Sequence, residues 1–192
     1  MVNDYIEIKN ERGDLLLKVS VAQPPEGATE LQRILSKGLS LDDANLPGAM
    51  LKGMKLNFAK LDSANLSGAN LEDAELAMSQ MGDVDLSNAN LKNADLYGVS
   101  LFGANLRGAN LQGVCLRGAS LSGADLRDTD LTNADLTPDN MTVETDLTSV
   151  DLTGAILEGT KLQGAQYNLE TKFPEGFDPE AAGMVQVGGS DS

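Results

Sequence analysis

Apolar residues recur at every fifth position along most of this chain. Every fifth residue from position 41 to position 141 is Leu, except at positions 81 and 141, where it is Met. A small residue, usually Ala, stands two positions before each of them, and Gly, Asn or Asp follows two positions after most of them. A pattern this regular indicates a repeat architecture, in which neighbouring repeats together bury one continuous core.

A five-residue period excludes an ordinary helix and a flat strand. On an α-helix five residues advance by about 500°, so successive leucines would spread over every face. On a flat strand an odd period places successive leucines on alternate faces. The backbone must therefore turn once in every pentapeptide, at the Gly, Asn or Asp, which tolerate a positive φ. The Leu and the small residue two positions before it then point inward.

The triplet Ala-Asp/Asn-Leu carries a family resemblance. It occurs as Ala44-Asn45-Leu46, Ala64-Asn65-Leu66, Ala94-Asp95-Leu96, Ala104-Asn105-Leu106 and Ala124-Asp125-Leu126. With these repeats, residues 39–167 resemble the pentapeptide-repeat family, and in particular its cyanobacterial members. The resemblance implies an all-β fold, a right-handed quadrilateral (square) parallel β-helix of about six coils with about 20 residues each. The coils would stack about 4.8 Å apart, as paired strands do.

Residues 1–38 lie outside the repeats and are expected to cap the first coil, because an open end would pair with other chains. Two apolar runs, 5–9 and 15–21, flank Asn10–Gly13 and predict a hairpin. A capping box at Thr29 predicts a short helix that runs to Lys37. A docking or oligomerising module is the alternative role for this segment.

Residues 168–192 follow the repeats and are similar to endings common in cyanobacterial members of the family. Phe173 and Phe177 are expected to cover the last coil. Residues 185–192 end in Gly, Ser and Asp and predict a disordered tail.

The five-residue register changes once. Leu136 and Met141 are followed by Leu147, which indicates one extra residue near Thr142–Glu144, soon after Pro138. A bulge or small loop is expected there. It is either a tolerated insertion or a loop that contacts a partner.

Composition narrows the possible partners. The chain has 29 acidic and 14 basic residues, no His and a net charge of −15, which argues against nucleic acid or an anionic membrane as a partner. The charge favours solubility or attraction to a basic protein surface. The N-terminus has no signal-peptide pattern and no apolar run is long enough to span a membrane, so a cytoplasmic location is expected.

The sequence offers no catalytic constellation. Without His, a Ser-His-Asp or Cys-His arrangement is impossible, and one Cys, Cys115, permits neither an internal disulfide nor a zinc site. Gly103 and Gly108 have P-loop spacing but lack the following Lys, and the residues after Asp83 lack the Gly and Glu of a calcium loop. We therefore expect that the protein is not an enzyme and that it binds neither a cofactor nor a metal ion.

Residues about 20 apart should lie above one another, so the exterior can be mapped. We name each of the four faces by the first Leu of its inward column, Leu41, Leu46, Leu51 or Leu56. With a one-residue shift after the break, Asp146 is expected on the Leu46 face, Asp151 on the Leu51 face, Glu158 on the Leu56 face and Lys161 on the Leu41 face. In this map each face has four acidic and two basic residues, a net charge of −2.

Two functions follow. The leading one is a non-enzymatic protein-binding scaffold, a monomer or weak homo-oligomer that presents a rigid acidic surface to a protein partner. The alternative, implied by the resemblance, is a DNA mimic that binds a type II topoisomerase such as gyrase. An even distribution of charge argues against the mimic, which needs a concentrated acidic strip.

Apolar residues at outward positions form a candidate partner patch. Phe58 and Met78 share one outward column, Tyr97 lies in the neighbouring column, and Phe102 lies one corner further on. Contiguous exposed apolar groups tend to mark interfaces, although scattered surface hydrophobes are also normal.

Overall fold

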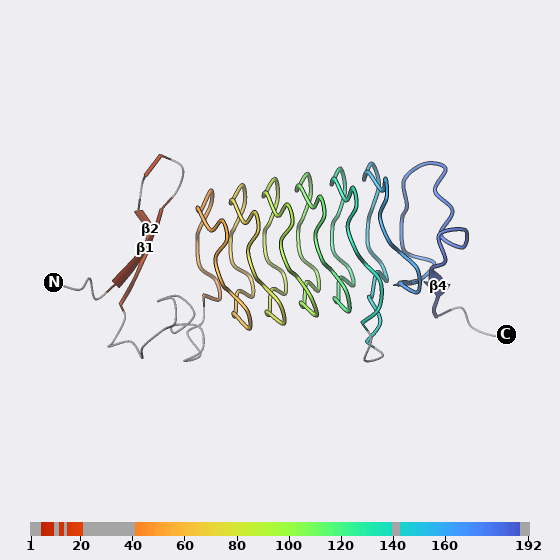
Figure 1. The fold of residues 1–192 in the computed structure, drawn as a ribbon, viewed down its shortest axis with the longest axis horizontal. Coiled ribbons are helices and arrows are strands. Elements are labelled where there is room, and N and C mark those ends of the chain that lie inside the picture. Colours follow the sequence, from red (N-terminus) through yellow and green to blue (C-terminus); the bar gives the residue numbers. More distant parts are fainter. Residues whose placement is uncertain (1–4, 10–11, 14, 21–40, 140–142, 189–192) are drawn as a thin grey trace.

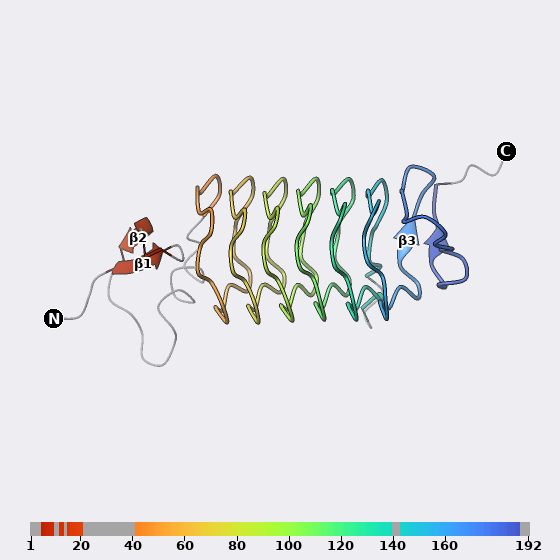
Figure 2. The same cartoon turned by 90° about the horizontal axis from the view of Figure 1, so that it is seen from above.

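The computed structural model describes residues 5–9, 12–13, 15–20, 41–139 and 143–188. Most of this chain forms a right-handed quadrilateral β-helix, whose coils lie side by side along the long axis (Figure 1). The view turned by 90° shows the same regular stack (Figure 2). The described residues contain no α-helix. Single parallel bridges such as Asn45↔Asn65 and Asn65↔Asp85 join residues 20 apart.

Each pentapeptide makes one straight piece and one corner. The Leu and the small residue two positions before it point inward, and the residue between them pairs with the neighbouring coils. Leu46 N donates to Asn65 O at 2.7 Å, and Asn65 N donates to Ala44 O at 2.9 Å. The second residue after the Leu has a positive φ, as at Gly48 (65°) and Asn88 (56°). This confirms the turn predicted at that place.

The interior is a set of leucine columns. Leu46, Leu66, Leu86 and Leu106 are completely buried, one above another. Burial of a Leu side chain contributes about 1.5–3 kcal/mol, so the columns are the main source of stability. Ser79 replaces the usual inward Ala, and its hydroxyl donates to the Leu56 carbonyl at 2.9 Å. The buried hydroxyl is thereby satisfied.

The bridged residues define four walls, which we number along the chain. Wall 1 consists of Asn45, Asn65, Asp85, Asn105, Asp125, Asp151 and Lys172. Wall 2 consists of Met50, Asn70, Asn90, Asn110, Asp130 and Ile156. Wall 3 consists of Lys55, Glu75, Asp95, Cys115, Asp135 and Lys161, and wall 4 of Lys60, Gln80, Ser100, Ser120, Asp146 and Gln166. Corners 1 to 4 are the two-residue turns that follow the corresponding walls.

The prediction of one extra residue at the break is wrong. Ser120 pairs with Asp146 and Asp125 with Asp151, a separation of 26 residues instead of 20. A whole pentapeptide and one further residue therefore leave the coil. Pro138 provides the reason, because it holds the corner place that needs a positive φ, and its ring fixes φ near −65°. Met141, which seemed to continue the repeat, lies outside the described residues.

The corrected register also overturns the even distribution of charge. Asp146 belongs to wall 4, Asp151 to wall 1, Lys161 to wall 3, and Glu158 to corner 2, which follows wall 2. Wall 4 with corner 4 carries the acids Asp42, Asp43, Asp62, Asp83 and Asp146, and the base Lys60. Wall 3 with corner 3 carries the acids Glu75, Asp95 and Asp135, and the bases Lys55, Arg117 and Lys161. Wall 4 with corner 4 is thus the most negative side of the repeat, and wall 3 with corner 3 is balanced.

The predicted N-terminal hairpin is present. β1 (Tyr5–Lys9) and β2 (Leu15–Ser20) pair antiparallel. Ile8 is buried with the core, and the Lys9 carbonyl accepts a hydrogen bond from Met50 N at 2.9 Å. β1 thus contacts the first coil. The helix predicted from Thr29 lies outside the described residues.

At the C-terminal end β3 (Gln166–Tyr167) pairs parallel with β4 (Val185–Gln186). Phe173 packs edge-on against Tyr167 and stacks on Phe177, with ring centroids 5.5 and 5.2 Å apart, and both phenylalanines contact the core. The predicted start of a disordered tail at residue 185 is wrong, because β4 is tied to β3. Residues 189–192 lie outside the described residues.

Candidate interaction surface

Corner 3 presents two large apolar side chains in successive coils. Phe58 is 71% exposed and Met78 is 50% exposed. The backbone holds the two coils together, since Phe58 N donates to Ala77 O at 3.0 Å. A Cβ added at Gly98 would collide with the sulfur of Met78, so the Met78 side chain extends across Gly98 toward the next coil. The two residues and the space over Gly98 form one apolar edge.

Phe58 and Met78 are the only large apolar residues with a positive φ among the described residues, at 63° and 59°. Gly, Asn, Asp and Ser hold the equivalent place in the other described corners. The left-handed conformation costs about 1–2 kcal/mol for a residue with a Cβ, and it is rare for bulky side chains. The fold alone would favour Gly or Asn here, so Phe58 and Met78 each add backbone strain, a feature that often clusters at functional sites.

Tyr97 lies on the same corner but is already engaged within the chain. Its hydroxyl donates to Asp139 Oδ2 at 2.8 Å, and this hydrogen bond raises the pKa of Tyr97. Asp139 belongs to the insertion that begins at Pro138. The insertion also contacts corner 3 at Arg117, whose guanidinium donates to the Pro138 carbonyl at 3.4 Å. Tyr97 therefore connects the apolar edge to the insertion.

Phe102, the fourth residue of the predicted patch, is 58% exposed but stands on corner 4. Wall 4 separates it from the three residues on corner 3. Its neighbours are acidic: Asp62 Oδ1 accepts a hydrogen bond from Gly82 N at 2.7 Å, and Asp83 Oδ1 lies where a Cβ at Gly103 would be. The structure thus divides the patch between two edges of the same wall.

Wall 4 itself is polar and has small side chains in its middle. Ser100 and Ser120 lie between Gln80 and Asp146. One border of this wall is the apolar edge of corner 3, and the other is acidic corner 4. Sequence reasoning found the apolar residues but missed this arrangement, because its map of the acidic residues was out of register. The available signal was Pro138 at a place that needs a positive φ.

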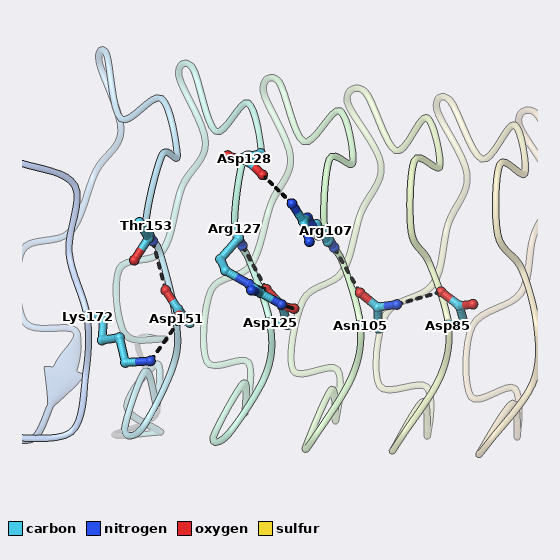
Figure 3. Close-up of polar contacts among 9 residues, drawn as sticks. All are labelled: Asp85, Asn105, Arg107, Asp125, Arg127, Asp128, Asp151, Thr153 and Lys172. Carbon is cyan, nitrogen blue, oxygen red and sulfur yellow. Dashed lines mark hydrogen bonds and ion pairs between the residues drawn. The ribbon is translucent and has the colours of Figure 1, made fainter.

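On wall 1 and corner 1, by contrast, ion pairs neutralise Asp125, Asp128 and Asp151 (Figure 3). Asp85 accepts a hydrogen bond from the neutral Asn105 amide. Arg127 Nε donates to Asp125 Oδ1 at 2.8 Å, and its hydrogen bonds lower the pKa of Asp125. Burial alone would raise the pKa of Asp151, but hydrogen bonds from Thr153 and Lys172 outweigh it and lower that pKa to about 2. The carboxylates of Asp125 and Asp151 therefore stabilise the rod through contacts within the chain.

The residues considered above for metal, phosphate and thiol chemistry lie at ordinary places in the repeat. The described residues contain no group of three or more His, Cys, Asp or Glu residues that is placed to hold a metal ion. Gly103 and Gly108 are ordinary corner residues with positive φ. Cys115 is half-buried on wall 3, and burial raises the pKa of its thiol, which disfavours the reactive thiolate. No helix long and apolar enough to cross a membrane occurs in the described chain.

Comparison with known proteins agrees with the repeat geometry. A family model described as pentapeptide repeats matches in eight copies, over residues 40–77, 79–118, 116–137 and 143–166. No curated protein gives a match.

Solved structures that resemble this chain include three cyanobacterial pentapeptide repeat proteins. One from Nostoc PCC 7120 is 40% identical, over 58% of this chain and 84% of that chain, with a TM-score of 0.34. Rfr23 from Cyanothece 51142 is 33% identical, over 62% and 63%, with a TM-score of 0.39. HetL from Nostoc PCC 7120, which is involved in heterocyst differentiation regulation, is 23% identical, over 84% and 93%, with a TM-score of 0.40.

Proposed function

Because this chain belongs to the pentapeptide-repeat family, we propose that it is a non-enzymatic scaffold that binds a protein partner through corner 3 and the adjoining wall 4. Members of the family are generally structural or binding scaffolds. Phe58, Met78 and Tyr97 supply the apolar part of the proposed surface, and Phe102 lies on its far border. The hydrogen-bonded ladder fixes the backbone at these positions before a partner arrives, which reduces the backbone entropy lost on binding.

The observation that carries the proposal is the pair Phe58 and Met78. Both are exposed, adjacent and held in a conformation that bulky residues avoid. Large apolar side chains are typical anchors of protein interfaces, where each contributes strongly when it is covered. Both side chains are exposed although their backbone is strained, and this fits a binding role better than a structural one.

Site-specific photocrosslinking tests the proposal. The photoreactive p-benzoylphenylalanine is placed at position 58 in one protein and at Met50, an exposed residue of wall 2, in a matched control. Irradiation in cells of the source organism should give one dominant protein adduct at position 58 that is absent at position 50. Equal adducts at both positions, or none at position 58, would overturn the proposal.

The corrected charge map gives the DNA-mimic alternative a specific observation in its favour. Within the part of the chain that the structure describes, Asp62, Asp83 and Asp146 form no ion pair. A gyrase supercoiling assay with the purified protein distinguishes the two functions. The scaffold proposal predicts unchanged supercoiling. Inhibition that is lost in Asp62→Asn/Asp83→Asn would favour the mimic instead.

A further inference from the structure

We propose that the partner contributes an amphipathic α-helix with a basic flank, which lies along wall 4 parallel to the rod axis. This inference rests on the proposed function and specifies the chemistry of the partner. The apolar stripe of the helix would contact Phe58 and Met78 on corner 3. Its Lys or Arg side chains would face Asp62 and Asp83 on corner 4.

The backbone of the rod excludes an added β-strand as the mode of binding on this wall. Gln80 N donates to Ala59 O at 2.8 Å, and Ser100 N donates to Ser79 O at 3.0 Å. These hydrogen bonds run along the rod axis to neighbouring coils, so the wall offers no free ladder edge. Strand addition needs such an edge, whereas a helix binds through side chains alone.

The spacing of the coils suits a helix. Coils stack about 4.8 Å apart, as hydrogen-bonded strands do. Residues i and i+3 of a helix differ in height by about 4.5 Å, and residues i and i+4 by about 6 Å. Successive apolar residues on one helix face can therefore meet successive coils at Phe58, at Met78 and over Gly98. An extended strand places same-face residues about 6.6 Å apart and falls out of step sooner.

The carboxylates of corner 4 determine which flank of the partner helix must be basic. In the described part of the chain, ion pairs join most cations of walls 1, 2 and 3 and their corners to nearby carboxylates, as in Arg107–Asp128 (3.3 Å) and Lys52–Glu72 (2.8 Å). Asp62 and Asp83 have no such compensation among the described residues. Their charges remain available to attract a basic surface, chiefly within about 8 Å at physiological salt.

Two opposite charges on wall 4 set an orientation. Lys60 stands nearer the N-terminus of the chain, and Asp146, which Gln166 follows on this wall, stands four coil steps away, about 19 Å along the axis. A helix of about 13 residues spans that length. Its N-terminus carries partial positive charge and its C-terminus partial negative charge. The favoured arrangement therefore places the N-terminus of the helix near Asp146 and its C-terminus near Lys60.

Designed probe peptides test the inference. One fluorescein-labelled helical peptide carries Leu at i, i+3, i+4 and i+7 with Lys along one flank. A second replaces each Lys by Glu, and a third has the composition of the first with the Leu residues scattered. Fluorescence anisotropy with the full chain should show that the first probe binds at least about tenfold more tightly than either of the others.

Matched variants of the rod locate the site. Phe58→Asn/Met78→Asn removes the apolar edge while Asn tolerates the positive φ. Asp62→Asn/Asp83→Asn removes charge, while the amide oxygen introduced at position 62 still accepts a hydrogen bond from Gly82 N. Each pair should weaken binding of the first probe by at least about fivefold. Asp73→Asn/Glu158→Gln removes two charges from corner 2, across the rod, and should leave binding unchanged.

Three outcomes would overturn the inference. They are equal affinity for all three probes, unchanged affinity in both site variants, and an equal loss in the corner 2 control. If position 58 crosslinks to a partner while the basic helical probe does not bind, the proposed function stands and the helix inference fails. If position 58 gives no specific adduct, the proposed function fails at its own test.

Discussion

The phenolic hydroxyl of Tyr97 donates a 2.8 Å hydrogen bond to Asp139, a residue 42 positions later in the chain. It ties the insertion to corner 3, two coils before the point where the insertion leaves the ladder. Tyr97→Phe should therefore lower the free energy of unfolding by about 1 kcal/mol. Urea unfolding of Tyr97→Phe, Asp139→Ala and the double variant measures the coupling. Strictly additive effects would show that the contact contributes nothing to the fold.

The six-residue excess at the break predicts the result of a deletion. Removal of residues 138–143 together with Glu144→Gly restores the coil spacing of 20 and supplies a Gly at the place that needs a positive φ. This variant should fold with a circular dichroism spectrum like that of the wild type. Removal of Leu152 alone takes a buried residue out of the coil itself, shifts every later inward place by one and should unfold the C-terminal coils. Loss of structure in the six-residue deletion would contradict the assignment of residues 138–143 to a loop outside the coil.

A charge inside a leucine column should prevent folding. Leu106 is completely buried between Leu86 and Leu126, and Leu106→Asp would place an unpaired carboxylate where no water is available. The neighbouring change Arg107→Asp, at an outward corner place, is the matched control and should leave the chain folded. Circular dichroism and soluble yield measure both variants. A soluble, fully structured Leu106→Asp protein would contradict the assignment of the interior.

Acid should weaken the end of the rod that holds Asp151. Its pKa is about 2 in the folded chain, below the ordinary value of about 3.9 for an unfolded Asp. The resulting stabilisation is complete above about pH 4 and is lost as the pH falls toward 2. Asp151→Asn should lose less stability than the wild type between pH 5 and pH 2, measured by urea unfolding midpoints. Lys172→Gln removes one partner of Asp151 and should change the profile in the same direction.

The repeating part of the fold could be predicted from sequence because one local rule holds in each pentapeptide. Leu46 and Leu106 obey the same inward geometry, and the corner residue after each has a positive φ. The break could not be placed by counting apolar positions, since Met141 continues the count after Pro138 has already prevented the corner. β4 gave no signal, because a two-residue strand depends on the neighbouring coil for its pairing.

The candidate surface was predictable only in part. Exposure of Phe58 and Phe102 follows from their places in the pentapeptide, and both are exposed in the structure. The hydrogen bond from Tyr97 to Asp139 depends on the length and course of the insertion, which no periodicity describes. The sequence also did not reveal that wall 4 with corner 4 is the most acidic side, because the assumed shift after the break assigned Asp146 to another face.

The central claim is that corner 3 keeps Phe58 and Met78 for binding, at the expense of folding. It is tested most directly by measuring the unfolding temperature and the affinity for the basic helical probe on the same variant, Phe58→Asn/Met78→Asn. Asn tolerates the left-handed conformation, so each substitution should add about 1 kcal/mol to the free energy of unfolding and raise the unfolding temperature. The affinity for the probe should fall. Phe58→Ala/Met78→Ala, which removes the side chains but retains a strained Cβ, should lose affinity without that gain. Lower stability in the Asn variant than in the Ala variant, together with unchanged affinity, would contradict the account.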